Sequence, residues 1–144
     1  MTVSEFPTPS SLIPHRPPFL FVDQITALDP GKSASGLWHL TGDESFFAGH
    51  FVGRATLPGV LMCEAIAQVG AIAILSDEKF KNKLPLFGGI DSARFRRQVV
   101  PGDTLQMSMT LTKMSARAGK GSGVATVNGE VACECELFFV VVES

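Results

Sequence analysis

A histidine and a carboxylate lie fourteen positions apart in the stretch GHFVGRATLPGVLMCEAIAQ, residues 49–68. Glu64 lies within an apolar run, where an ionised carboxylate is costly unless it is partnered or faces a cleft. A carboxylic acid in such a dry site has a shifted pKa and can act as a general acid or base. Glu64 is therefore predicted to be catalytic, and the alternative is a structural role at a rim or beside a buried base.

His50 alone would more often be a surface or satisfied core histidine, but its setting favours catalysis. Phe51 follows it, and Gly49 before it allows a close backbone approach. Pro58 and Gly59 then begin a predicted helix, whose first N–H groups lack partners and lie at the positive end of the dipole. The Gly59 N–H could bind a carbonyl oxygen that gains negative charge during a reaction.

A base, a carboxylic acid and a site for a polarised carbonyl are the parts needed to remove a proton next to a carbonyl and expel a β-hydroxyl. Gln68 lies four residues after Glu64, so the two share one face of the helix. Gln68 is predicted to orient Glu64. A role as a spacer on the helix face is an equal alternative.

The segment 58–75 is predicted to be a helix, because it is too long for a strand and rich in Ala, Leu and Met. At about 27 Å its length is marginal for a bilayer. Glu64 and Gln68 would each be costly inside lipid. A helix that is apolar on nearly all faces is better explained as the buried axis of a folded domain.

The rest of the chain carries strand signals. Leu105, Met107, Met109 and Leu111 alternate with polar residues, as in a half-buried strand. The segments predicted as strands are 19–28, 33–40, 84–100, 104–114, 121–127 and 130–142, with connections at 29–32, 101–103, 117–123 and 128–130. One domain of residues 1–144 is expected, with an irregular N-terminal segment 1–11. Its class is α+β, a curved antiparallel sheet wrapped around one long central helix.

Composition limits the classes of function. The chain has 144 residues, of which 45% are hydrophobic and 18% charged, as in a globular domain. A net charge of −2 gives no general attraction to nucleic acid. The three cysteines (Cys63, Cys133 and Cys135) have no metal-ligand spacing and are predicted to be reduced thiols that pack in a core. With no secretory signal visible, we expect a cytoplasmic protein without a membrane span.

Positive charge is concentrated between residues 79 and 97, where six basic residues accompany one acid, Asp91. Such a segment suggests an acidic partner, and the alternative is an ordinary solvated face.

The motif GHF…PGVLMCEAIAQ resembles that of the 3-hydroxyacyl-(acyl-carrier-protein) dehydratases of bacterial fatty-acid synthesis. Three further segments agree in order and spacing: IPHRPPFLFVD (13–23), GGIDSARFRRQVVPGD (88–103) and GKGSGVATVNGEVACECEL (119–137). The resemblance covers about residues 12–142. It implies a hot-dog fold, which agrees with the sheet and helix inferred above.

The resemblance also implies a homodimer, often assembled into a trimer of dimers, with active sites at the dimer interface. In each site His50 would act with Glu64 of the facing protomer, and the Gly59 N–H would bind the thioester carbonyl. The substrate would be a (3R)-hydroxyacyl group on acyl carrier protein, and no metal or redox cofactor would be needed. The supporting residues would be Phe51, Pro58, Val60 and Gln68, and those docking the carrier protein Arg94, Arg96 and Arg97.

Glu rather than Asp at position 64 resembles the branch that dehydrates without isomerising the double bond. Val52 and Ala55 stand where that branch usually has prolines, so the loop should be more flexible. The chain has no tyrosine, so a gating aromatic would have to be Phe. Two alternatives stay open, a hot-dog acyl thioesterase and a non-catalytic partner subunit, although the latter would normally have lost one of the two catalytic residues.

Overall fold

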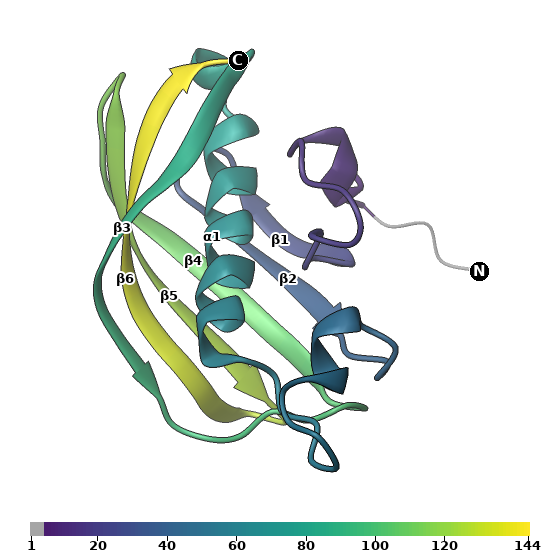
Figure 1. Ribbon diagram of the computed structural model, residues 1–144. Coiled ribbons are helices and arrows are strands. Elements are labelled where there is room, and N and C mark those ends of the chain that lie inside the picture. The colour runs from purple at the N-terminus through teal and green to yellow at the C-terminus, as the bar shows by residue number, and fades with distance from the viewer. Residues whose placement is uncertain (1–4) are drawn as a thin grey trace.

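The helix α1 (Gly59–Leu75) is the axis around which the chain folds in the computed structural model, which describes residues 5–144 (Figure 1). Pro58 is the N-cap residue, where its missing N–H costs nothing, and polar Ser76 caps the other end. The observed bounds confirm the predicted helix to within one residue. No helix among the described residues has the length and apolar character needed to span a bilayer.

Six antiparallel strands form one curved sheet that packs against α1 (Figure 1). They are β1 (Gln24–Asp29), β2 (Ser33–His39), β3 (Lys83–Phe95), β4 (Thr104–Met114), β5 (Ala118–Val127) and β6 (Glu130–Glu143). Their order across the sheet is β1-β2-β4-β5-β6-β3, so that β1 and β3 are the edges. The predicted α+β class, with one sheet around one helix, is confirmed.

Close contact between helix and sheet depends on side-chain alternation and on small residues. Leu105, Met107 and Met109 of β4 are buried against the core, as their spacing predicts. A Cβ atom at Gly123 of β5 would lie 2.2 Å from a methyl carbon of Ile66, so only glycine allows this approach. Much of the core therefore lies between α1 and the inner face of the sheet.

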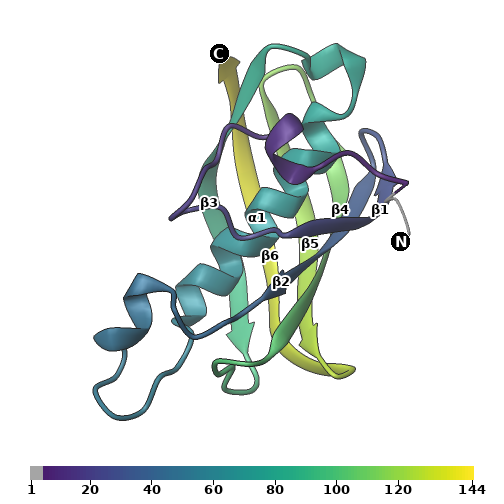
Figure 2. The ribbon, with the colours of Figure 1, turned by 90° about the vertical axis from the view of Figure 1, so that its right-hand side faces the viewer.

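The face of α1 opposite the sheet is covered by the N-terminal part of the chain, which crosses it in Figure 2. The prediction of a strand over residues 19–28 is wrong in its first half, because β1 begins only at Gln24. Residues 19–23 make no ladder. Their backbone is held by the side chain of Gln68, which accepts from the Phe21 N–H at 2.8 Å and donates to the Phe19 carbonyl at 3.0 Å.

A second correction concerns residues 117–123, predicted as a connection because of their glycines. β5 already begins at Ala118, and the turn lies just before it, where the Ser115 N–H donates to the Ala118 carbonyl at 2.8 Å. The glycines serve packing instead. A Cβ atom at Gly121, for example, would lie 2.4 Å from the sulfur of Met109.

Other turns follow the prediction. Asn128 and Gly129 both have positive φ, 51° and 81°, as an Asn-Gly hairpin requires. The N-terminal segment contains one short 3-10 turn at Pro9–Ser11, and residues 1–4 of the expected irregular segment lie outside the described residues. Further 3-10 turns occur at Ser45–Ala48 and Glu78–Phe80.

Candidate active site

Glu64 projects from the second turn of α1 and is held by Gln68 one turn later. The Gln68 amide donates to the Glu64 carboxylate at 3.0 Å. Gln68 itself is completely buried; the same Nε2 also donates to the Phe19 carbonyl, and its Oε1 accepts from the Phe21 N–H. The carboxylate is thereby oriented by a side chain that cannot easily rotate.

Burial raises the pKa of Glu64 above its usual value, and the hydrogen bond from Gln68 only partly opposes this effect. A carboxyl group with a raised pKa keeps its proton to higher pH and can donate it during a reaction. The geometry thus suits Glu64 to the part of a general acid.

His15 is a neighbour of Glu64 to which the sequence interpretation gave no role. Its Nε2 atom lies 3.7 Å from a Glu64 oxygen, too far for a hydrogen bond, and its buried Nδ1 atom has no partner among residues 5–144. Burial and, less strongly, the charge of Arg16 lower the pKa of His15. Both shifts disfavour the charged forms of the two side chains, so the contact gains little from charge. In the sequence, the only indication that His15 belongs to the site was its position in the segment IPHRPPFLFVD, which resembles the dehydratase family.

His50 lies in the loop between the 3-10 turn at Ser45–Ala48 and α1, with its ring stacked on Phe51 at a centroid distance of 3.9 Å. Its Nδ1 atom lies 2.8 Å from the Thr56 carbonyl oxygen. Because a carbonyl can only accept, Nδ1 carries the hydrogen of the neutral ring, and Nε2 keeps a free lone pair. His50 is therefore set up to take a proton through Nε2.

Gly59 is the first residue of α1, so its N–H has no partner within the helix. A Cβ atom here would lie 3.0 Å from the ring of Phe95 on β3, so the position is tight for any other residue. Pro58 before it is half-buried, whereas Val60 after it is 65% exposed. The helix start can thus present a polarising N–H at a surface that is largely apolar.

Within one chain His50 and Glu64 are not brought into contact. No hydrogen bond or ion pair among residues 5–144 joins them, since His50 bonds to Thr56 and Glu64 to Gln68. Phe51 beside His50 is 53% exposed. The two predicted catalytic residues are each well placed, but one chain alone does not assemble them into a pair.

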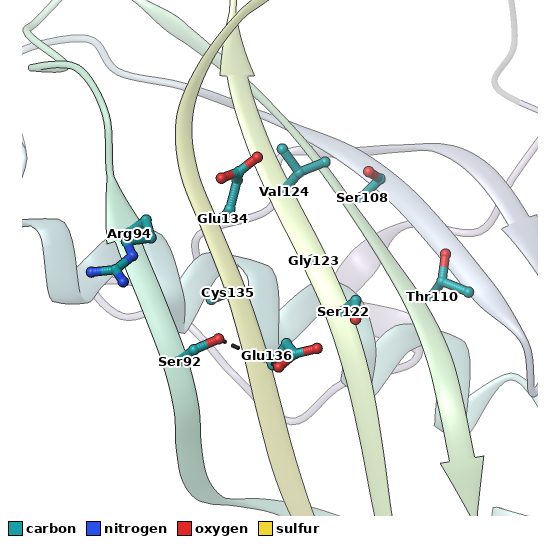
Figure 3. Close-up of a pocket in the computed structure, with 10 residues that line it drawn as sticks. All are labelled: Ser92, Arg94, Ser108, Thr110, Ser122, Gly123, Val124, Glu134, Cys135 and Glu136. Atoms are coloured by element: carbon teal, nitrogen blue, oxygen red, sulfur yellow. Dashed lines mark hydrogen bonds between the residues drawn. The ribbon is translucent and has the colours of Figure 1, made fainter.

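Two hollows in the structure bear on where the candidate site lies. One, of about 390 Å³, is lined by His15, Glu64 and Gln68 together with apolar residues of β3 and β6, including Leu86 and Phe139. Figure 3 shows the other, of about 390 Å³, on the outer face of the sheet away from α1. The outer hollow contains polar side chains but neither His50 nor Glu64, so only the first belongs to the candidate site.

The arginines predicted to dock a partner differ in their freedom. Arg96 pairs with Glu134 at 2.7 Å, and Arg97 pairs with Glu130 at 2.7 Å. Arg94 lines the outer hollow and has no ion pair among residues 5–144 (Figure 3). Acidic residues of β6 and its hairpin therefore neutralise much of the charge that made this segment look basic in sequence.

Comparison with known proteins places the chain in a family. A family model described as a FabA-like domain matches residues 13–136. The 3-hydroxyacyl-(acyl-carrier-protein) dehydratase FabZ of Clostridium botulinum strain Langeland is 58% identical over 130 residues, 90% of each chain. The enzyme of the same name from Staphylococcus epidermidis is 49% identical over 97% of each chain.

Among solved structures, the dehydratase heterocomplex ApeI:P from Xenorhabdus doucetiae matches with a TM-score of 0.77 and 16% identity, over 97% of this chain and 93% of that one. A mutant thioesterase from Pseudomonas aeruginosa matches with a TM-score of 0.65 and 12% identity, over 87% and 84%. At such low identities these two matches establish the shared fold alone.

Proposed function

The chain belongs to the FabA-like domain family, and we propose on that basis that it dehydrates (3R)-3-hydroxyacyl-acyl carrier protein to the trans-2-enoyl thioester. The observation that carries this proposal is the half-buried Glu64 carboxyl group, whose pKa is raised by partial burial and which Gln68 holds in place. An acid of this kind suits the departure of a β-hydroxyl group as water.

The proposed reaction divides the work among three groups. The Gly59 N–H binds the thioester carbonyl and stabilises the negative charge that develops there. The Nε2 atom of His50 removes the α-proton, because Nδ1 is committed to the Thr56 carbonyl. Glu64 gives its proton to the β-hydroxyl as the C–O bond breaks, so that one water leaves and the double bond forms. Transfer of the α-proton from His50 back to Glu64 resets the site.

We propose that the site is shared between two copies of the chain. Strand β3 is a sheet edge of 13 residues and exposes large apolar side chains. They are Leu86, Phe87, Ile90 and Phe95. Such an edge readily pairs with another chain. Pairing two copies along β3 would cover these side chains and bring His50 of one copy towards Glu64 of the other. The resemblance further leads us to expect that three such dimers assemble into a trimer of dimers.

The proposed partner is an acyl carrier protein, as the names of the relatives suggest, and the proposed location is the cytoplasm. Docking would depend mainly on Arg94, because Arg96 and Arg97 have acidic partners in their own chain. The reaction belongs to fatty-acid synthesis or a related pathway, and its proposed steps use only side chains and a backbone N–H.

The decisive experiment incubates the purified protein with crotonyl and longer enoyl thioesters and follows loss of the enoyl absorbance as water adds. A dehydratase will hydrate the double bond and leave the thioester intact. Release of free thiol without hydration would instead identify a thioesterase. No reaction of either kind, with carrier-protein and pantetheine thioesters alike, would leave the non-catalytic partner subunit as the explanation.

A further inference from the structure

The fold gathers all three cysteines of the chain at one point of the core. Cys63 projects from α1, whereas Cys133 and Cys135 lie on the inner face of β6, two residues apart. The three sulfur atoms lie within 4.8 Å of one another. Exposure is 0% for Cys63 and Cys133 and 4% for Cys135. Cysteines that are 70 residues apart in sequence thus form a compact, water-free cluster.

This cluster has the number and spacing of donors for a three-coordinate thiophilic centre. A central atom with sulfur bonds of about 2.3 Å, the length found for zinc, needs sulfurs separated by about 4 Å or less. Three of the four cross-strand neighbours of the strand cysteines are small, since Cys135 pairs with Gly123 and Ala93, whereas Cys133 pairs with Ala125 and Phe95. Small rotations of the three side chains can therefore bring the sulfurs to bonding distance.

The side chains around the cysteine cluster determine which charge a bound ion should carry. Gln68 is the only polar side chain in the buried class among residues 5–144, so no buried cation offsets three thiolates. A monovalent or divalent metal would leave net negative charge in an apolar core, which is costly. A trivalent ion would balance the three thiolates and leave no net charge.

We propose that Cys63, Cys133 and Cys135 form a binding site for a trivalent thiophilic main-group ion, with arsenite as the probe. The reaction is balanced and involves no oxidation: As(OH)₃ and three thiols give As(SR)₃ and three waters. Three As–O and three S–H bonds break, while three As–S and three O–H bonds form. The product is neutral and needs no fourth ligand. It would tie α1 to β6 at the residue next to Glu64.

The test uses the reduced full-length protein, refolded with and without sodium arsenite and separated from excess reagent. Because the sulfurs are buried, uptake during refolding should exceed uptake by the native protein. Native mass spectrometry should show one arsenic gained and three hydrogens lost, and X-ray absorption should show three sulfur neighbours. A gain of arsenic and one hydroxyl with only two hydrogens lost, which signifies two sulfurs, would overturn the proposal, as would no stable uptake.

Single Cys63→Ala, Cys133→Ala and Cys135→Ala variants are the matched controls. Each keeps two thiols, so each should retain arsenic at least about tenfold less well and only with a hydroxyl in the third position. Arsenite should raise the unfolding midpoint of the parent protein and not that of the variants. Equal retention by the parent and by any single variant would contradict the three-sulfur site. The readouts do not use enzymatic activity, so they are independent of the proposed dehydratase function.

Discussion

The two ends of the candidate site are built in different ways. Glu64 lies on a long buried helix, and the side chain that orients it, Gln68, is itself anchored by two backbone hydrogen bonds. His50 lies in a loop whose next four residues, 51–54, are all exposed, with one backbone hydrogen bond to its ring. The acid is therefore positioned by the core of its own chain, whereas the base lies at a surface.

This contrast supports the proposal that a single chain holds two halves of different sites. An anchored, half-buried carboxyl needs no further support, but a half-buried histidine beside exposed aromatic and aliphatic residues is typical of a surface that another protein covers. Phe51, Val60 and Phe95 are all at least half exposed near the start of α1. The predictions below test the two halves in turn, from the largest effect to the smallest.

Glu64→Gln should remove most of the activity while the fold is kept, because the amide has the same shape but no acidic proton. We expect turnover to fall by about a hundredfold or more. Hydration and dehydration assays would measure the loss, and circular dichroism would check the fold. Near-normal turnover would exclude Glu64 from the mechanism.

Mixing His50→Ala with Glu64→Gln chains tests whether the site is shared. Each variant alone should be nearly inactive. After joint unfolding and refolding, half of the dimers are mixed and one of their two sites is intact, so about a quarter of the activity should return. If both residues of a site came from one chain, nothing would return. Mass spectrometry must show that mixed dimers formed.

Gln68→Leu tests how Glu64 is anchored, since leucine keeps the site dry but cannot hydrogen-bond. Turnover should fall about tenfold as the carboxyl loses its orientation. The Gln68 hydrogen bond lowers the pKa of Glu64, so its loss should raise that pKa further and move the alkaline limb of the kcat profile to higher pH. Gln68→Asn, a shorter amide, is the control. A fall in turnover without movement of the alkaline limb would point to a structural role only.

Arg94→Glu should weaken catalysis on carrier-protein substrates by about threefold in KM at low salt and leave pantetheine substrates unchanged. The effect should fade as salt rises. Lys113→Glu, at the far end of β4, is a matched charge reversal away from the predicted docking residues. Equal losses on both kinds of substrate would count against docking by Arg94.

The last prediction concerns stability. Because the folded protein raises the pKa of Glu64 above the usual 4.5, ionised Glu64 destabilises the fold. This penalty is absent below the usual value, grows as pH rises through the raised value and is then constant. Glu64→Gln should therefore be more stable than the parent at neutral pH, with a difference that disappears in acid. Chemical unfolding between pH 4 and 8 would measure it, with surface Glu136→Gln as control.

Local pattern alone predicted much of this molecule. The helix over 58–75 follows from a run of good helix formers, and the strand over 104–114 follows from its strict alternation. The Asn128-Gly129 turn follows from the backbone conformation that these residues tolerate. The roles predicted for Glu64 and His50 came from residue chemistry and from a motif, both of which are short-range signals.

What the sequence could not show depends on contacts between distant segments. Gln68 binds backbone at Phe19 and Phe21, 49 and 47 positions away. His15 reaches Glu64 across a similar gap. The glycines before Gly123 looked like a turn, because nothing local indicates that Met109 and Ile66 will need the space.

Sequence by itself thus determined the helix and the sheet class and singled out Glu64 and His50 as the predicted acid and base, since each depends on a few neighbouring residues. Tertiary structure decided which basic side chains form ion pairs and which thiols lie close together. Arg96 and Arg97 form ion pairs with acidic residues of β6, which lies beside them only in the folded chain. Cys63 lies close to Cys133 and Cys135 because α1 packs on the sheet. The physical reason is that pairing and burial depend on distance in space, which the folded chain alone sets.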